Sequence, residues 1–275
     1  MIDLASRSWR VAGESEPEGI GQKAGQTRRA PASQRREAAP EAGSAGRESP
    51  PARDVRAVVF DLDGVILETE ELWNDVRENL VRERGGRWTD RAQADMMGMS
   101  STEWSRYLHD ALGLKEPPEE INREVVRRML ELYEERLPLI DGAPEAVRRL
   151  AERWPLGLAS SSNRELINRA LAVSGLAEFF RATVSSEEVA RGKPAPDVYL
   201  EAARRLGVYP SRCGAVEDSG SGIRSAHDAG MFVVAIPNRS FPPPAEALQL
   251  ADVVLESISR LVPETFASRS DSSRP

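Results

Sequence analysis

Two aspartates directly follow a buried apolar run of the sequence. Asp61 and Asp63 stand two residues apart after residues 55–60, and Gly64 comes next, where a glycine permits a sharp turn of the chain. Two neighbouring carboxylates repel each other, and a cation relieves that repulsion. Carboxylate oxygens are the hard ligands that suit Mg²⁺, so the pattern favours a magnesium site. An aspartate that only stabilises a turn is the alternative.

Polar residues also follow three later apolar runs. Ser160 and Ser161 follow the second run, Lys193 lies beyond the third, and Glu217 and Asp218 follow the fourth. Hydroxyl and N–H groups at the start of a helix can bind phosphate, although a helix-capping serine or a solvated lysine explains each signal alone. Successive signals at strand ends indicate one site, because open α/β sheets bind ligands at the carboxyl ends of their strands.

The apolar runs themselves predict a parallel sheet. They cover residues 55–60, 156–159, 182–184, 214–216, 232–236 and 253–255. Helical patterns lie between them, among them 145–153, 197–206 and 222–229. Nearly continuous apolar strands that alternate with helices are typical of a sheet covered on both faces. The predicted fold class is therefore α/β, with a Rossmann-like parallel sheet as its core.

A helical block interrupts this alternation. Residues 70–137 hold helical patterns at 72–84, 101–112 and 118–136 but no convincing strand. The block is too long for an ordinary crossover, so we expect an inserted helical domain. The expected organisation is a disordered extension over 1–53, an α/β core formed by 54–67 and 140–266, a helical cap domain over 68–139, and a disordered tail over 267–275.

Composition narrows the function classes. The net charge of −7 argues against nucleic-acid binding, and the single cysteine, Cys213, excludes an intramolecular disulfide. The sequence has no apolar run of about 18 residues, which argues against a membrane span. We expect a cytoplasmic monomer. Residues 14–53 hold almost no large apolar side chain, which predicts disorder. A misassigned start codon, with the native chain beginning near Val55, is an alternative explanation of that segment.

The motif set resembles that of the haloacid dehalogenase (HAD) superfamily, and within it the phosphatase and β-phosphoglucomutase-like branch. The resemblance covers about residues 55–262 and rests on Asp-Leu-Asp-Gly-Val at 61–65, Ser160, Gly-Lys-Pro-Ala-Pro at 192–196 and Glu-Asp-Ser at 217–219. It implies a HAD-like core. The helical block resembles the cap domain that this branch inserts after the first motif.

The resemblance implies a role for each aspartate. Asp61 is expected to attack phosphorus and form an aspartyl-phosphate, while Asp63 protonates the leaving alcohol and later deprotonates water. Dehalogenases of the superfamily lack an acid two positions after the nucleophile, so Asp63 favours hydrolysis of a phosphate ester. Phosphonate-cleaving relatives use a cap lysine. Lys115 is the one lysine of the helical block, and its polar turn does not suit that role.

The resemblance also implies a cofactor and a substrate class. The expected cofactor is Mg²⁺, held by Asp61, the backbone carbonyl of Asp63, and Asp218. Glu217 is expected either to bind the ion directly or to contact the groups that bind it. The residues expected to contact phosphoryl oxygens are Ser160, Ser161 and Lys193. The expected partner is a small phosphorylated metabolite, in the first place a sugar phosphate.

Residues of the helical block are expected to select the substrate. Gly98 lies in a methionine-rich stretch that resembles the specificity loop of the cap. Trp73 stands where β-phosphoglucomutases carry a histidine, and Ser101 stands where they carry an arginine. Trp73 packs either on a sugar or in the core. Trp104 and Tyr107 are one turn apart and are expected on an apolar helix face, with the cleft as the alternative.

Two other functions remain open from the sequence. A β-phosphoglucomutase-like phosphotransferase is the runner-up, weakened by the departures at Trp73 and Ser101. A catalytically silent binding module of the same fold is the third reading. Intact motif residues at every strand end argue against that third reading, because loss of activity would be expected to spoil at least one of them.

Overall fold

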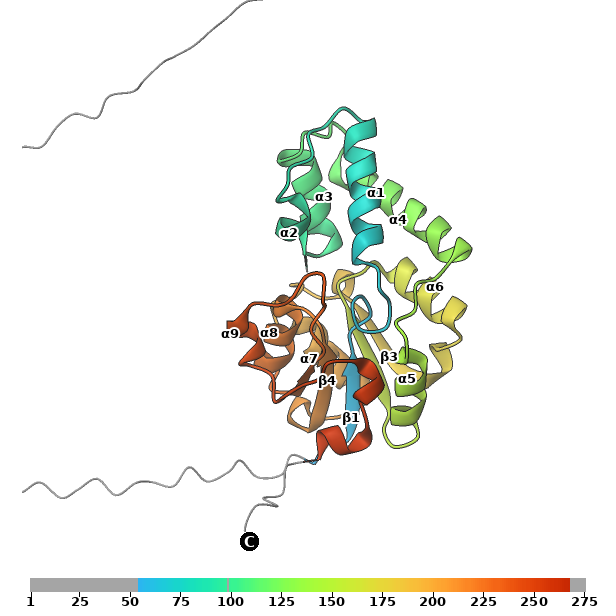
Figure 1. Cartoon of the computed structure of the whole chain (residues 1–275), viewed down its shortest axis with the longest axis vertical. Helices are drawn as coiled ribbons and strands as arrows, with labels where there is room; N and C mark the ends of the chain where they lie inside the picture. The colour runs from blue at the N-terminus through green and yellow to red at the C-terminus, as the bar shows by residue number, and fades with distance from the viewer. Residues whose placement is uncertain (1–53, 98, 268–275) are drawn as a thin grey trace, which may run out of the picture. The chain divides into compact units, whose positions relative to one another are not determined.

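The computed structural model describes residues 54–97 and 99–267, and a six-stranded parallel sheet forms its core (Figure 1). The strand order is β3-β2-β1-β4-β5-β6. The strands are β1 (Ala57–Phe60), β2 (Leu156–Ser160), β3 (Phe180–Ser185), β4 (Cys213–Glu217), β5 (Phe232–Ala235) and β6 (Val253–Val254). All six predicted strands and the predicted α/β class are confirmed. The sheet places β1 between β2 and β4, next to the two strands that end in serine and in glutamate.

The side chains of β1 show why both faces of the sheet need cover. Successive residues of a strand point to opposite faces. Val58 and Phe60 belong to one apolar cluster, while Ala57 and Val59 belong to a second, and all four are fully buried. Such a strand is stable only with a helical layer on each side, which explains its unbroken apolar sequence.

Helices supply these two layers. The helices are α1 (Glu70–Glu83), α2 (Ala92–Met96), α3 (Ser101–Asp110), α4 (Pro118–Glu135), α5 (Ala143–Ala151), α6 (Arg164–Ser174), α7 (Asp197–Leu206), α8 (Gly220–Asp228) and α9 (Ala245–Leu248). Apolar residues of α5 and α6 complete the first cluster, and those of α7 and α8 complete the second. The six helices predicted with bounds are present, and α2, α6 and α9 are additional.

Helices α1 to α4 form a group of their own between β1 and α5, which we call the insert (Figure 1). Two short linkers connect it to the rest of the chain and pair with each other. The backbone N–H of Glu68 donates to the carbonyl of Pro138 at 2.8 Å, and the N–H of Ile140 donates to the carbonyl of Ile66 at 2.9 Å. The insert therefore leaves and rejoins the core at one place.

The insert also touches the core beyond the linkers. Helix α4 packs against α6. The Ser101 hydroxyl donates to Glu187 Oε1 at 3.1 Å, and Asn163 Nδ2 donates to Asn122 Oδ1 at 3.2 Å. The proposed division into core and cap at residues 67/68 and 139/140 agrees with the place of the linkers and stays a proposal.

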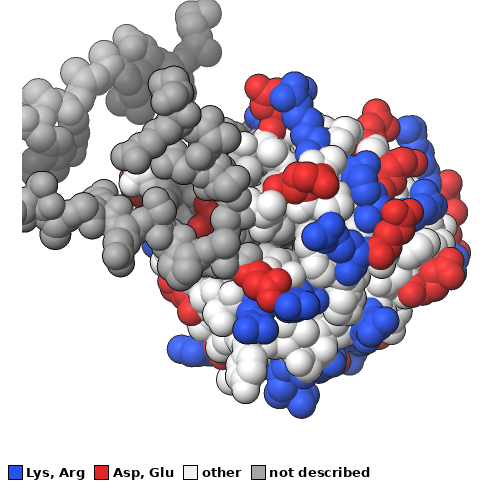
Figure 2. Space-filling model, turned by 90° about the horizontal axis from the view of Figure 1, so that it is seen from below, with Lys and Arg blue, Asp and Glu red and all other residues white. Residues whose placement is uncertain are grey.

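Surface features bear on the remaining expectations. Among the described residues, no helix combines the length and the apolar character needed to cross a lipid bilayer. Figure 2 shows basic and acidic side chains mixed over the face in view, outside the part covered in grey. The expectations of disorder over 1–53 and over the last residues of the chain lie outside the described residues. Monomeric state, cytoplasmic location and absence of nucleic-acid binding stay predictions.

Candidate active site

The carboxyl ends of the central strands bring the predicted site residues together. Asp61 follows β1, Ser160 ends β2, Glu217 ends β4, and Lys193 lies in the loop between β3 and α7. The groups that line a cavity of about 60 Å³ at this edge include the predicted residues Asp61, Asp63, Trp73, Ser161, Lys193 and Asp218. The predicted residues that line this cavity therefore come from five separate segments of the chain.

Lys193 is the central cation of the site. Its ammonium lies 2.8 Å from Asp61 Oδ1 and 2.6 Å from Glu217 Oε1, and the lysine is almost fully buried. Burial by itself lowers the pKa of this lysine, but the two carboxylates outweigh burial and raise it above the usual range. Lys193 is thus firmly charged and positions the Asp61 carboxylate. The Tyr199 hydroxyl donates to Glu217 Oε1 at 2.7 Å and helps to fix that partner.

Three carboxylates form a cluster that fits a divalent cation. Asp61, Glu217 and Asp218 each place an oxygen within 4.8 Å of the others, and Asp218 Oδ2 is buried without a hydrogen-bond partner. Burial first, and then Glu217 and Asp61, raise the pKa of Asp218 well above its usual value. Burial, opposed by Lys193, raises the pKa of Asp61 to about 8. A bound cation removes this penalty, because it favours the ionised carboxylates. The all-oxygen donor set suits Mg²⁺.

Gly64 provides the space for this cluster. Its φ is +80°, a conformation that side-chain-bearing residues rarely adopt. A Cβ atom added here would lie 1.9 Å from Asp218 Oδ2, far inside contact distance. The glycine is therefore required both by the turn after Asp63 and by the close approach of Asp218.

Asp63 has surroundings very different from those of Asp61. Its Oδ1 accepts hydrogen bonds from Thr69 Oγ1 at 2.6 Å and from Trp73 Nε1 at 3.4 Å. Its Oδ2 accepts from Ser162 Oγ at 2.7 Å and from Ser160 Oγ at 3.4 Å. Four neutral donors from the core and the insert thus hold one half-buried carboxylate, which fixes its orientation at the cavity.

In the serine loop after β2, the two serines that line the cavity lie one position later in the sequence than expected. Ser161 and Ser162 contribute to the cavity lining, whereas Ser160 lies buried behind it with its hydroxyl toward Asp63. Ser162 was not predicted as a site residue. The loop is held from behind, because Ser185 Oγ donates to the Ser162 carbonyl at 2.7 Å and Ser186 Oγ donates to the Ser161 carbonyl at 3.0 Å.

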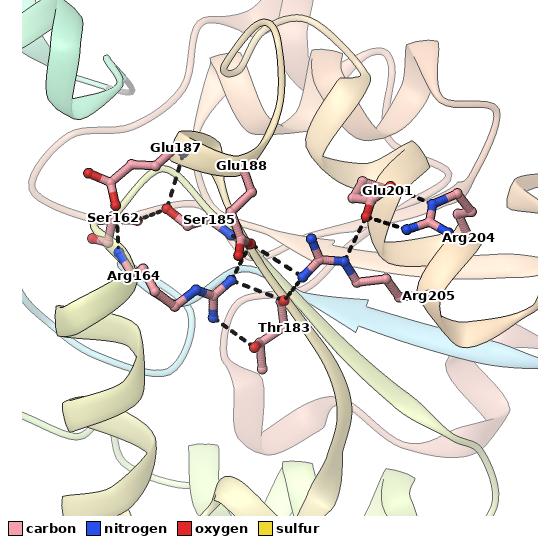
Figure 3. Close-up of polar contacts among 9 residues, drawn as sticks. All are labelled: Ser162, Arg164, Thr183, Ser185, Glu187, Glu188, Glu201, Arg204 and Arg205. Atoms are coloured by element: carbon pink, nitrogen blue, oxygen red, sulfur yellow. Dashed lines mark hydrogen bonds and ion pairs between the residues drawn. The ribbon is translucent and has the colours of Figure 1, made fainter.

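A polar network supports this loop from the edge of the sheet (Figure 3). Glu187 N–H donates to Ser185 Oγ at 3.2 Å, and the Arg164 backbone N–H donates to Glu187 Oε2 at 2.9 Å. The Arg164 guanidinium reaches Thr183 Oγ1 at 2.8 Å and also pairs with Glu188. The network ties the loop to α6 and β3, so the serines have little freedom to move relative to Asp61.

The insert contributes the far wall of the cavity. Trp73 is 5% exposed and lines the cavity, so it belongs to the site as well as to the core. Trp104 also lines it, as the cleft alternative supposed. Tyr107 is absent from that lining among the described residues, and its hydroxyl donates to Asp95 at 2.9 Å instead. Gly98, the expected specificity position, lies outside the described residues.

Arg77 is among the cavity-lining residues of the insert that were missed from the sequence. Arg77 lies on α1 with its Cζ atom 4.5 Å from the centroid of Trp73 and 4.8 Å from that of Trp104. The signal was available, because Arg77 is four residues after Trp73 and three before the buried Leu80, which places it on the buried face of the helix.

Comparison with known proteins identifies the family. Residues 58–236, most of the described chain, match the haloacid dehalogenase-like hydrolase family. The chain belongs to this family. As a haloacid dehalogenase-like hydrolase it is 33% identical over 231 residues to hexitol phosphatase B of Escherichia coli K12, a match that covers 76% of this chain and 95% of that protein.

Solved structures of similar proteins agree with this family assignment. The CbbY protein of Rhodobacter sphaeroides, solved with phosphate, has a TM-score of 0.67 and 26% identity over 75% of this chain and 96% of its own. A β-phosphoglucomutase of Clostridium difficile has a TM-score of 0.67 and 25% identity over 77% and 95%. The predicted superfamily, its phosphatase branch and the predicted class, a hydrolase of phosphoric monoesters, are confirmed for this haloacid dehalogenase-like hydrolase.

Proposed function

We propose that the protein is a Mg²⁺-dependent phosphatase that hydrolyses a small phosphomonoester, in particular a sugar phosphate, through an aspartyl-phosphate on Asp61. The observation that carries the proposal is the arrangement around Asp61. One oxygen of this buried carboxylate lies 2.8 Å from Lys193, beside Asp218 with its unpartnered oxygen and within the same cavity as Asp63. Hexitol phosphatase B supports the sugar-phosphate class as a relative.

The residues divide the reaction between them. Asp61 attacks phosphorus, the ester P–O bond breaks, and the electron pair stays with the leaving oxygen, which Asp63 protonates. Asp63 then accepts a proton from a water molecule whose oxygen attacks phosphorus, and the Asp61 carboxylate is released. Lys193 offsets the negative charge that otherwise repels an anionic nucleophile from a phosphate.

The metal would be held by Asp61, Asp218 and the backbone carbonyl of Asp63. When bound, Mg²⁺ supplies charge neutralisation for the phosphoryl oxygens. Glu217 is engaged on both oxygens, by Lys193 and Tyr199 on Oε1 and by the N–H groups of Asp218 and Ser219 on Oε2. We therefore assign Glu217 to holding the lysine and the Asp218 loop, one layer behind the ion.

Replacement of Asp61 by asparagine tests the nucleophile. Asp61→Asn keeps the shape of the side chain but removes its negative charge, so hydrolysis of p-nitrophenyl phosphate with Mg²⁺ should fall by about 10³-fold or more. The matched control is Asp75→Asn, an exposed aspartate of α1, which should keep wild-type activity. Wild-type turnover in the Asp61 variant, or equal wild-type turnover in EDTA, would overturn the proposal.

A β-phosphoglucomutase-like phosphotransfer is the second candidate, favoured by the likeness to the Clostridium difficile structure. The two candidates differ in the fate of the phosphoryl group. Incubation with β-glucose 1-phosphate and a bisphosphate primer should release inorganic phosphate if the protein is a phosphatase. Formation of glucose 6-phosphate without free phosphate would establish the phosphotransferase instead.

A further inference from the structure

We propose that Arg77, packed against Trp73 and Trp104, binds an anionic group, a carboxylate or a second phosphate, on the leaving-group portion of the substrate. The inference rests on the proposed phosphatase function and narrows its substrate class. It makes Arg77 a specificity-determining residue of the insert, distinct from the groups that handle the transferred phosphoryl group.

Arg77 is a buried cation that forms no ion pair with a carboxylate of the described residues. It is 7% exposed, and its Nε is buried without a hydrogen-bond partner. Within residues 54–97 and 99–267, no carboxylate forms an ion pair with its guanidinium. By contrast, Arg128 and Arg164, which are more exposed, each pair with a glutamate at the surface. Because arginines are rarely buried unless they are paired, a ligand is the natural source of the missing anion.

The two tryptophans position the guanidinium of Arg77. The indole rings of Trp73 and Trp104 have centroids 6.0 Å apart, and the guanidinium Cζ lies 4.5 and 4.8 Å from them. Because the two centroids are much closer to each other than rings on opposite faces would be, the rings contact the guanidinium from adjacent sides. A guanidinium can donate two parallel N–H bonds to the oxygens of a carboxylate or phosphate, and the contacts with the two rings hold it in place.

The charge of Arg77 persists at neutral pH. Burial lowers the pKa of Arg77 to about 10, and the nearby Glu70 and Asp63 carboxylates oppose that effect. Glu70 lines the same cavity, but burial first and Asp63 second raise the pKa of Glu70 to about 7. Glu70 thus lies in the same cavity without forming an ion pair with Arg77.

The position of Arg77 separates it from the phosphoryl group. Trp73 lies between the two regions, since its Nε1 faces Asp63 Oδ1 at 3.4 Å while its ring contacts the Arg77 guanidinium. Asp63 is the group proposed to protonate the leaving oxygen. A substrate that extends from Asp63 along Trp73 toward Arg77 therefore presents the end of its leaving group to the guanidinium.

Three probes on one six-carbon scaffold test the inference: mannitol 6-phosphate, 6-phosphomannonate and mannitol 1,6-bisphosphate. They differ only in an alcohol, a carboxylate or a second phosphate at C1. The wild-type kcat/KM should be about tenfold or more higher for at least one anionic probe than for the alcohol, because the buried guanidinium is paired only in that complex. The preferred probe tells whether the group is a carboxylate or a phosphate.

Substitution of Arg77 separates recognition from a purely structural role. Arg77→Gln should collapse the preference for the anionic probe to near unity, and Arg77→Lys should retain part of it. Arg82→Gln, an exposed arginine on the same helix, is the matched control and should keep the wild-type ratio. Equal kcat/KM for all three probes in the wild type would overturn the inference, as would an Arg77→Gln protein that keeps the ratio.

Direct binding distinguishes failure of this inference from failure of the phosphatase proposal. Asp61→Asn protein should bind the preferred anionic probe about tenfold or more tightly than mannitol 6-phosphate in calorimetry, whether or not turnover occurs. The double variant Asp61→Asn/Arg77→Gln should lose that difference. No hydrolysis of any probe by wild type contradicts the phosphatase, whereas equal affinities in the single variant contradict the role of Arg77.

Discussion

Asp61 and Asp63 differ in the groups that hold them. Asp61 faces a buried cation, Lys193, and lies beside a cluster of carboxylates suited to a metal. Asp63 faces hydroxyl and indole donors instead, the shortest from Thr69 and Ser162. The first environment favours a charged nucleophile beside a cation, and the second orients a carboxyl group that can exchange a proton with the leaving oxygen.

The proposed proton transfer by Asp63 predicts a dependence on the leaving group. In Asp63→Asn, turnover of an alkyl phosphate should fall about 100-fold or more relative to p-nitrophenyl phosphate, because nitrophenolate leaves without protonation. The measurement is the ratio of single-turnover phosphorylation rates for the two esters in wild type and variant. Equal losses for both esters would show that Asp63 acts by position alone.

Individual site residues were predictable to the extent that they stand at strand ends. Asp61, Lys193 and Asp218 follow apolar runs, and parallel topology forces them together. Ser162 was missed, because three successive serines have the same chemistry and only the turn decides which hydroxyl faces the cavity. The spacing of Arg77 from Trp73 indicated that it lies on the buried face of α1, but its contact with Trp104 could not be predicted, because the sequence does not reveal how α1 packs against α3.

At the scale of elements, the turn after β1 couples the strand to the metal cluster. Gly64 adopts a positive φ in this turn, and its lack of a side chain leaves space for Asp218, which follows β4. Phe60 of β1 pairs with Val216 of β4. The residues that follow this pair, Asp61 and Glu217, therefore lie side by side. The geometry of the cluster depends on this turn as much as on its ligands.

Substitution of Gly64 should therefore lower the free energy of unfolding by more than backbone strain alone would. Gly113 is a matched control, because its φ is +83° and nothing lies within 4 Å of an added Cβ. Gly113→Ala should lose about 1–2 kcal/mol of unfolding free energy from strain alone. Gly64→Ala should lose more and should also lose its stabilisation by Mg²⁺, measured by urea unfolding with and without the ion. Equal losses in the two variants would contradict the steric role of Gly64.

The elements themselves were largely predictable, for physical reasons that differ between core and insert. Continuous apolar strands and glycine stops after α7 and α8 are local signals, so the sheet and its helices followed from sequence. Helix α2 has five residues, too few for a helical period to show in the sequence. The contact between Ser101 and Glu187 was also beyond prediction, because it joins surfaces 86 residues apart.

For the whole molecule, the buried carboxylates link metal binding to stability. The pKa of Asp61 is raised from 3.8 to about 8 by burial in the absence of a cation, and that of Asp218 is raised in the same direction. The folded state then binds these protons more tightly than the unfolded state. The unfolding free energy of the metal-free protein should consequently fall as pH rises from 3.8 toward about 8.

Mg²⁺ should reverse this loss, because it binds the ionised carboxylates of the folded state. The increase in thermal midpoint on replacing EDTA by Mg²⁺ should be larger at pH 8 than at pH 5. Asp218→Asn should reduce the increase at pH 8, whereas Asp228→Asn, about half exposed on α8, should not. An increase that is equal at both pH values would argue against a site built from these carboxylates.

The paired linkers between insert and core restrict how the two can move. Because Ile66–Glu68 and Pro138–Ile140 hydrogen-bond to each other, they form a narrow two-stranded ribbon at a single crossing. Such a ribbon bends across its width far more readily than it shears along its length. If the insert opens, this ribbon favours rotation about the crossing over sliding along it. Such a rotation would carry Trp73, Arg77 and Trp104 together, because all three lie on helices of the insert.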